Sequence, residues 1–192
     1  MIETLLSYLK REVLPRWKTI IFTSEFALSL LVACLVGWLG PGSFHSKPLM
    51  NEFVAAVAAY AAIAMGFCVA GMTIALTLPS KELMERLATK TIPGVHGNSL
   101  SGLLFVFSWT AFVHWFAVLL MFTALLVYGS DQPLLGPDAS AAWRVGASIT
   151  CAFVFYCLCQ FAITIITISQ AGEVYIDELK KEVARKEEQK QN

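Results

Sequence analysis

Four long apolar segments constrain this chain more than any other feature of its sequence. They cover residues 20–39, 53–78, 103–128 and 145–169. A helix of about 20 apolar residues is what the roughly 30 Å hydrocarbon core of a bilayer requires. The composition agrees, since 57% of the residues are hydrophobic and only 15% are charged. The sequence therefore predicts an all-α, polytopic membrane protein with four transmembrane helices.

The segments beside these spans are short, which predicts a single membrane domain over residues 1–192. An amphipathic helix is expected at 1–16, a cytoplasmic loop with a short helix at 79–100, and a cytoplasmic helical tail at 172–192. In the first of these, apolar residues recur at helical spacing and charged residues lie mostly on the other face. Such a helix suits either the membrane interface or packing on the inner face of the protein itself.

The lysine and arginine residues predict the orientation of the chain. Four lie in the N-terminal segment, three in the middle loop and five in the tail, which is twelve of the fourteen. Only Lys47 and Arg144 lie in the other two loops. Because cytoplasmic loops carry the excess of Lys and Arg, both termini are expected in the cytoplasm. The expected location is the plasma membrane, which is the inner membrane if the source is a bacterium.

Several polar side chains lie inside the predicted spans and are candidates for a cation or proton path. They are Glu25, Ser29, His114, Gln160, Thr164 and Thr167. At 1.5 Å per residue, Glu25, Gln160 and His114 are expected at about 8, 14 and 16 Å from the cytoplasmic edge, so they can meet inside one bundle. An acid at such a depth must be protonated, paired or hydrated.

Each of these residues keeps two interpretations. Glu25 is either a structural pin paired across helices or part of a conducting path. Gln160 is either a hydrogen bond between helices or the wall of a water-filled path. His114 shares one face of its span with Thr110, and it is either neutral and hydrogen-bonded or a relay for protons.

Two further patterns predict surfaces for packing and docking. A row of small residues in the second span favours close approach of another helix, within the subunit or between subunits. This row is Ala58, Ala62, Gly66 and Ala70. In the tail, Ile176, Leu179 and Val183 form a narrow apolar seam at 3,4 spacing. The seam predicts a docking or self-association helix, and the alternative is a solvated helix.

The sequence gives no sign of catalysis. Its five cysteines all lie in the apolar spans and are expected to be packing residues. Its three histidines are scattered, and neither a metal-ligand cluster nor a nucleophile motif is present. We therefore expect no enzyme activity, no cofactor, no metal and no direct binding of nucleic acid.

Two classes of function remain. Four short-looped spans, an acid in the first span and a cytoplasmic helical tail resemble the layout of several oligomeric channel families and of small bacterial membrane effectors of phage defence. The first class is an ion-conducting or membrane-permeabilising homo-oligomer, in which a ring of subunits lines a pore with the Glu25 or Gln160 face. The alternative is a non-conducting membrane anchor or sensor that recruits a cytoplasmic partner, for example in a phage-defence system. The expected partners are the lipid bilayer, further copies of the chain and, in the alternative, a cytoplasmic protein.

Overall fold

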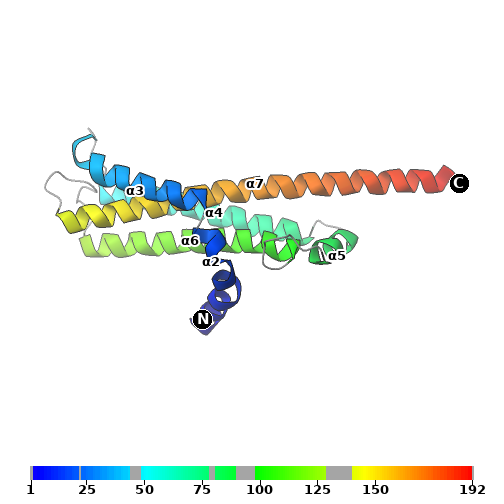
Figure 1. Ribbon diagram of the computed structural model, residues 1–192, viewed down its shortest axis with the longest axis horizontal. Helices are drawn as coiled ribbons and strands as arrows, with labels where there is room; N and C mark the ends of the chain where they lie inside the picture. Colours follow the sequence, from blue (N-terminus) through cyan, green and yellow to red (C-terminus); the bar gives the residue numbers. More distant parts are fainter. Residues whose placement is uncertain are drawn as a thin grey trace.

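The protein is a bundle of long helices, which the computed structural model of the chain describes for residues 2–21, 23–43, 49–77, 81–89, 98–128 and 140–191. These residues contain no strand, which confirms the all-α prediction. Four helices lie side by side along the long axis of the molecule (Figure 1): α3 (Ser24–Ser43), α4 (Met50–Thr77), α6 (Ser99–Tyr128) and α7 (Ala141–Gln191). Helix α3 packs mainly on α7 and α4 mainly on α6, while contacts between α6 and α7 join the two pairs.

Three helices are long and apolar enough to cross a membrane, which confirms the prediction of a multi-pass membrane protein. They are Met50–Thr77, Ser99–Val127 and Ala141–Lys181. The first predicted span, 20–39, is not one unbroken helix, because α2 (Trp17–Ile21) ends before α3 begins at Ser24. The side chain of Thr23 caps the new helix, since its hydroxyl accepts a hydrogen bond of 3.4 Å from the Phe26 N–H. A shorter apolar helix, Ser24–Val36, lies within α3.

Helices α6 and α7 also begin at side-chain caps. The Asn98 side chain accepts a hydrogen bond of 2.7 Å from the Ser101 N–H at the start of α6. The Ser140 hydroxyl accepts one of 3.2 Å from the Trp143 N–H at the start of α7. Each cap satisfies a backbone donor that the first turn of a helix leaves without an intrahelical partner.

The N-terminal segment changes its helical form twice before α2. Helix α1 (Ile2–Tyr8) leads into a π-helical turn, η1 (Leu9–Val13), and then into a 3-10 turn, η2 (Leu14–Arg16). Pro15 has no N–H to donate, so the regular pattern cannot continue through it. The Leu14 N–H instead bonds to the Leu9 carbonyl, and the Trp17 N–H bonds to the Leu14 carbonyl. The segment runs across the long axis of the bundle (Figure 1).

The core of the bundle has two apolar clusters. One joins Met50, Val54 and Val57 of α4 to Met121 of α6, at the end where α7 begins. The other lies further along the bundle and joins α6 to α7, where it is made by Val113, Ala117, Tyr156 and Cys157. Ile20 and Phe26 pack against this second cluster, so α3 starts part-way along α6 rather than at its end.

Gly71 of α4 lies directly against side chains of both α6 and α7. A Cβ atom at that position would lie 2.5 Å from the Phe107 ring and 3.1 Å from Ile168 of α7. The absence of a side chain therefore lets three helices meet.

Two elements extend the bundle at the end opposite the start of α7. The short helix α5 (Lys81–Thr89) packs on α6. Helix α7 continues well beyond the other helices to Gln191 (Figure 1). The predicted loop at 79–100 falls partly outside the described residues, as do the first residue and the last residue of the chain.

Candidate functional site

A layer of polar groups joined by hydrogen bonds lies in the centre of the bundle. It consists of the half-buried Tyr60 side chain on α4 and the buried Thr110, His114, Thr164 and Gln160 on α6 and α7, where Gln160 takes part through its main-chain carbonyl. His114, Thr110 and Thr164 are 0% exposed. Because a buried polar group without a partner is costly, the bonds of this polar layer determine how the three helices can pack.

His114 connects α6 to α4. Its Nδ1 atom lies 2.6 Å from the Thr110 carbonyl, and its Nε2 atom lies 3.0 Å from the Tyr60 hydroxyl. A carbonyl can only accept, so Nδ1 carries the proton and donates it. In the neutral ring Nε2 is then an acceptor, and the Tyr60 hydroxyl donates to it. That hydroxyl also lies 3.4 Å from the Cys157 carbonyl of α7.

Thr110 connects α6 to α7. Its hydroxyl lies 2.7 Å from the Thr164 hydroxyl and 3.5 Å from the Gln160 carbonyl. The Thr164 hydroxyl also donates to the Gln160 carbonyl, at 2.9 Å. The polar layer therefore links α4, α6 and α7 in one chain of hydrogen bonds.

Aromatic rings close the polar layer on one side. The Phe161 ring meets Tyr60 edge to face at a centroid distance of 5.9 Å, and it meets His114 at 6.2 Å. Phe67 of α4 packs on Phe161 in turn, at 5.4 Å. With its hydroxyls and the His114 ring paired and aromatic rings beside it, the layer suits hydrogen bonding between helices, which holds membrane helices together.

The structure brings His114 and Gln160 together through Thr110, but it places Glu25 elsewhere. Glu25 lies in the first turn of α3 and is half-buried. Its carbonyl accepts a hydrogen bond of 2.6 Å from the buried Ser29 hydroxyl. Among the described residues, no hydrogen bond or ion pair joins Glu25 to His114 or Gln160. Thr167 is also outside the polar layer, because its hydroxyl bonds back to the Ile163 carbonyl at 2.8 Å.

The row of small residues predicted on the second span faces away from the core. Ala62, Gly66 and Ala70 are exposed and Ala58 is half-buried. A Cβ atom at Gly66 would find no atom within 4 Å. The face of α4 that packs on its neighbours is a different one, made by Ala61, Ala64, Cys68 and Gly71.

The apolar seam of the tail lies in the C-terminal part of α7. Ile176, Leu179 and Val183 are all exposed there, at 51%, 42% and 54%. This single chain therefore leaves the seam available for contact.

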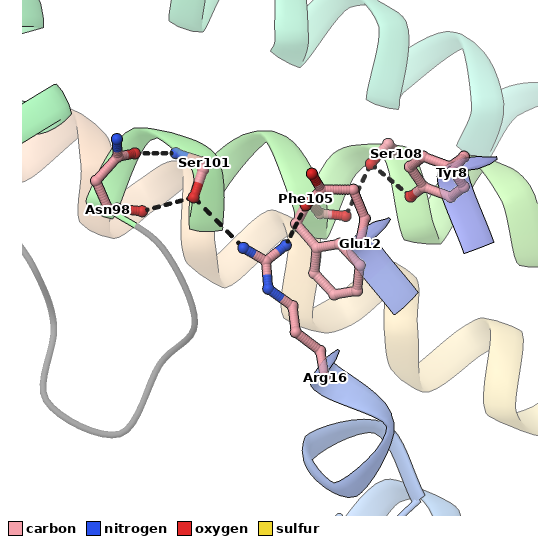
Figure 2. Close-up of polar contacts among 7 residues, drawn as sticks. All are labelled: Tyr8, Glu12, Arg16, Asn98, Ser101, Phe105 and Ser108. Carbon is pink, nitrogen blue, oxygen red and sulfur yellow. Dashed lines mark hydrogen bonds and ion pairs between the residues drawn. The ribbon is translucent and has the colours of Figure 1, made fainter. Parts of the chain in front are cut away.

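Sequence reasoning missed a second polar site, where the N-terminal segment contacts α6. Figure 2 shows this N-terminal interface, in which Tyr8, Glu12 and Arg16 meet Ser101, Phe105 and Ser108. Arg16 is only 5% exposed. Its Nη1 atom donates to the Glu12 carboxylate at 3.1 Å, and its Nη2 atom donates to the Ser101 hydroxyl at 3.4 Å.

Two further contacts complete the N-terminal interface. The guanidinium carbon of Arg16 lies 4.3 Å from the centroid of the Phe105 ring, which is the geometry of a cation–π contact. The hydroxyls of Tyr8 and Ser108 lie 2.9 Å apart. Burial raises the pKa of the Tyr8 hydroxyl above its ordinary value, because it disfavours the charged form. The only signal of this interface in the sequence was that Tyr8, Glu12 and Arg16 are spaced four residues apart. Such spacing predicts that the three side chains share one face of a helix.

A metal site needs several ligand side chains held close together. Within the described ranges, no group of three or more His, Cys, Asp or Glu side chains is placed to bind one. The five cysteines are free thiols, and they are distributed over α3, α4 and α7.

No protein-family model, no curated protein and no solved structure matches the chain.

Proposed function

We propose that the chain is a multi-pass membrane subunit that holds the end of α7 in the cytoplasm as a docking helix for another protein. One observation carries the proposal: α7 continues without a break to Gln191, beyond the other helices. At 1.5 Å per residue, the part after Gly172 extends for about 30 Å. The exposed seam of Ile176, Leu179 and Val183 lies on this part. Such a seam is what a partner with an apolar groove recognises.

The proposed topology has four crossings, with α3 as the first. Helix α3 has 20 residues, which at 1.5 Å per residue is about the 30 Å of a bilayer core. An even number of crossings puts both termini on the same side. The distribution of Lys and Arg favours the cytoplasm for that side, since twelve of fourteen lie in the three segments assigned to it. The proposed location is accordingly the plasma membrane.

The charges of the tail favour a different protein over a second copy as the partner of the seam. If Ile176, Leu179 and Val183 occupy the a and d positions of a heptad, Glu182 is at g and Glu187 at the following e. In a parallel pair of identical tails these two positions face one another across the seam. Two acids would then meet, and two copies in one membrane can pair only in parallel.

Site-specific photo-crosslinking in cells tests this proposal. A photoreactive residue in place of Leu179 should form adducts with another polypeptide, and one in place of Lys181, on the opposite side of the helix, should not. A photoreactive residue in place of Ile176 should lose its adduct when Leu179→Ser and Val183→Ser are added. Two results would contradict a docking seam. One is that adducts form only between copies of the chain, and the other is that the photoreactive residue in place of Lys181 gives as much adduct as the one in place of Leu179.

An oligomeric channel is the second candidate, and one observation favours it. The exposed row of Ala62, Gly66 and Ala70 leaves room for another helix to approach α4 closely. Because the His114, Thr110 and Thr164 side chains of the polar layer are paired within one subunit, we place a conducting path between copies. Gly66→Leu should then reduce the particle mass in detergent and abolish conductance in planar bilayers. Wild-type protein without conductance, or a Gly66→Leu variant of unchanged mass, would remove the support for a channel.

A further inference from the structure

The outer face of the N-terminal segment carries an exposed stripe of apolar and basic side chains. Leu6 and Leu14 are 58% and 59% exposed, and Lys10 and Trp17 are exposed as well. The positions follow one another at steps of four, four and three residues, so they share a face. That face lies opposite the side that carries the N-terminal interface with α6.

The position of the segment along α6 is as informative as its exposed face. The segment contacts α6 between Ser101 and Ser108, and the predicted span of that helix begins at residue 103. The segment also runs across the long axis of the bundle (Figure 1). If the long helices cross the bilayer, the segment therefore lies along the membrane plane, at the level where headgroups begin.

We propose that the N-terminal segment, residues 2–21, binds the headgroup layer of an anionic bilayer through this exposed stripe. Leu6, Leu14 and Trp17 point toward the acyl chains, and Trp favours this depth because its ring has an apolar body and a polar N–H. The ammonium groups of Lys10 and Lys18, both exposed, reach lipid phosphates while their stems cover apolar surface. The contacts of Arg16 hold the segment on α6 at this depth.

The turns at Leu9–Val13 and Leu14–Arg16 lie in the middle of this arrangement. A regular helix would keep one face along its whole length, whereas the π-helical and 3-10 turns alter the rotation per residue. Tyr8, Glu12 and Arg16, which follow one another at steps of four, share the side that faces α6 through these turns. The sequence left two alternatives for this segment, packing on the protein and lying at the membrane interface. In the proposed arrangement both apply, since one side of the segment packs on α6 and the other side is left for lipid.

Fluorescence of a single label in the full-length protein tests the proposal. The five native cysteines are replaced by alanine, and Leu6→Cys carries an environment-sensitive fluorophore. The protein is reconstituted into vesicles of phosphatidylcholine alone or of phosphatidylcholine with phosphatidylglycerol. In the anionic vesicles the emission should shift to shorter wavelength, and lipid-linked nitroxides near the headgroups should quench it. A label at Lys180→Cys, on the exposed tail, should keep the emission of a fluorophore in water.

Charge-removing variants test which lipid is recognised. Lys10→Gln with Lys18→Gln should return the Leu6→Cys emission in anionic vesicles toward its value in neutral ones. The matched control, Lys180→Gln with Lys181→Gln, removes the same charge from the tail and should leave the emission unchanged.

Three results would overturn the proposal. They are emission typical of water in both vesicles, equal emission in neutral and anionic vesicles, and a shift that grows with the ratio of protein to lipid, which would indicate a second copy as the occupant. The measurement needs no docking partner and does not depend on which side is cytoplasmic. Its failure is therefore separate from a failure of the tail to dock.

Discussion

The Tyr60 hydroxyl and the Nε2 atom of His114 lie 3.0 Å apart and join α4 to α6 across a part-buried contact. His114 itself is 0% exposed, so the loss of the Tyr60 hydroxyl leaves the buried ring without this partner. The pair is also a contact between residues 54 positions apart in the chain, so its strength reports on the packing of whole helices.

A double-mutant cycle on this pair should give a favourable coupling. Tyr60→Phe leaves Nε2 without its partner, so it should lower the free energy of unfolding by about 1–3 kcal/mol. In a His114→Leu background the same change should cost less, since no acceptor remains. The difference should be about 0.6–1.7 kcal/mol, the scale found for hydrogen bonds between membrane helices. Unfolding in detergent measures it, and additive effects would contradict the hydrogen bond.

Gly71 and Gly66 should respond oppositely to alanine. A Cβ atom at Gly71 would lie 2.5 Å from the Phe107 ring, so Gly71→Ala should destabilise the subunit by about 1–3 kcal/mol through overpacking. Gly66→Ala has open space around it, and it should stabilise α4 by up to about 1 kcal/mol, the difference in helix propensity. Thermal unfolding of both variants in the same detergent measures the two changes in stability. Equal effects would mean that the close approach at Gly71 is absent.

Alkaline pH should weaken the N-terminal interface through Tyr8. Burial raises the pKa of this hydroxyl in the folded protein above its value in the unfolded chain. Folding therefore binds the proton more tightly, and the stability from this group is lost as the pH rises above about 10. Hydrogen exchange of residues 2–21 should accelerate in that range beyond its ordinary dependence on pH. Tyr8→Phe should remove the additional acceleration, and an unchanged profile in this variant would show that Tyr8 is not the group responsible.

The long helices could be predicted from the sequence because a bilayer imposes a length of about 20 apolar residues, and such runs are plain to see. The helix start at Ser24 was missed, because the apolar run from residue 20 is long enough for one span. Thr23, with the acid Glu25 two residues after it, is nevertheless the pattern typical of a helix N-terminus. The face of α4 was also missed. Small residues lie all around that helix, so either the row Ala58–Ala70 or the row Ala61–Gly71 could accept a neighbouring helix. Only the packing of α4 on α6 shows that the row Ala61–Gly71 is the buried one.

The polar layer was predictable only in part. Helical spacing placed Thr110 with His114 and Gln160 with Thr164, because residues four apart share a face. Which faces would meet depends on how helices pair, and a single sequence contains no such information. The role of Tyr60 was missed for the same reason. Arg16 was counted only as a cytoplasmic cation, since its burial comes from contacts with Ser101 and Phe105 of α6, and the sequence does not show which helix the segment packs on.

Glu25 occupies a position with an ordinary structural explanation. It lies in the first turn of α3, where a carboxylate is favourable beside the free N–H groups of the helix start. Glu52 lies in the first turn of α4, where its carboxylate accepts a hydrogen bond of 3.3 Å from the Leu49 N–H. The two acids therefore have matching positions at the starts of two helices, and Glu52→Gln serves as the control for Glu25→Gln.

If Glu25 acts only at the helix start, Glu25→Gln should lower the free energy of unfolding by about 0.3–1 kcal/mol. Glu52→Gln should have a similar effect, and neither change should alter particle mass or conductance. A loss of several kcal/mol from Glu25→Gln alone would instead indicate a buried ionic partner that the change leaves unpaired. A changed cation preference in planar bilayers from Glu25→Gln alone would place the carboxylate on a conducting path between subunits. Unfolding and conductance thus separate the three roles, because each role changes a different measured property.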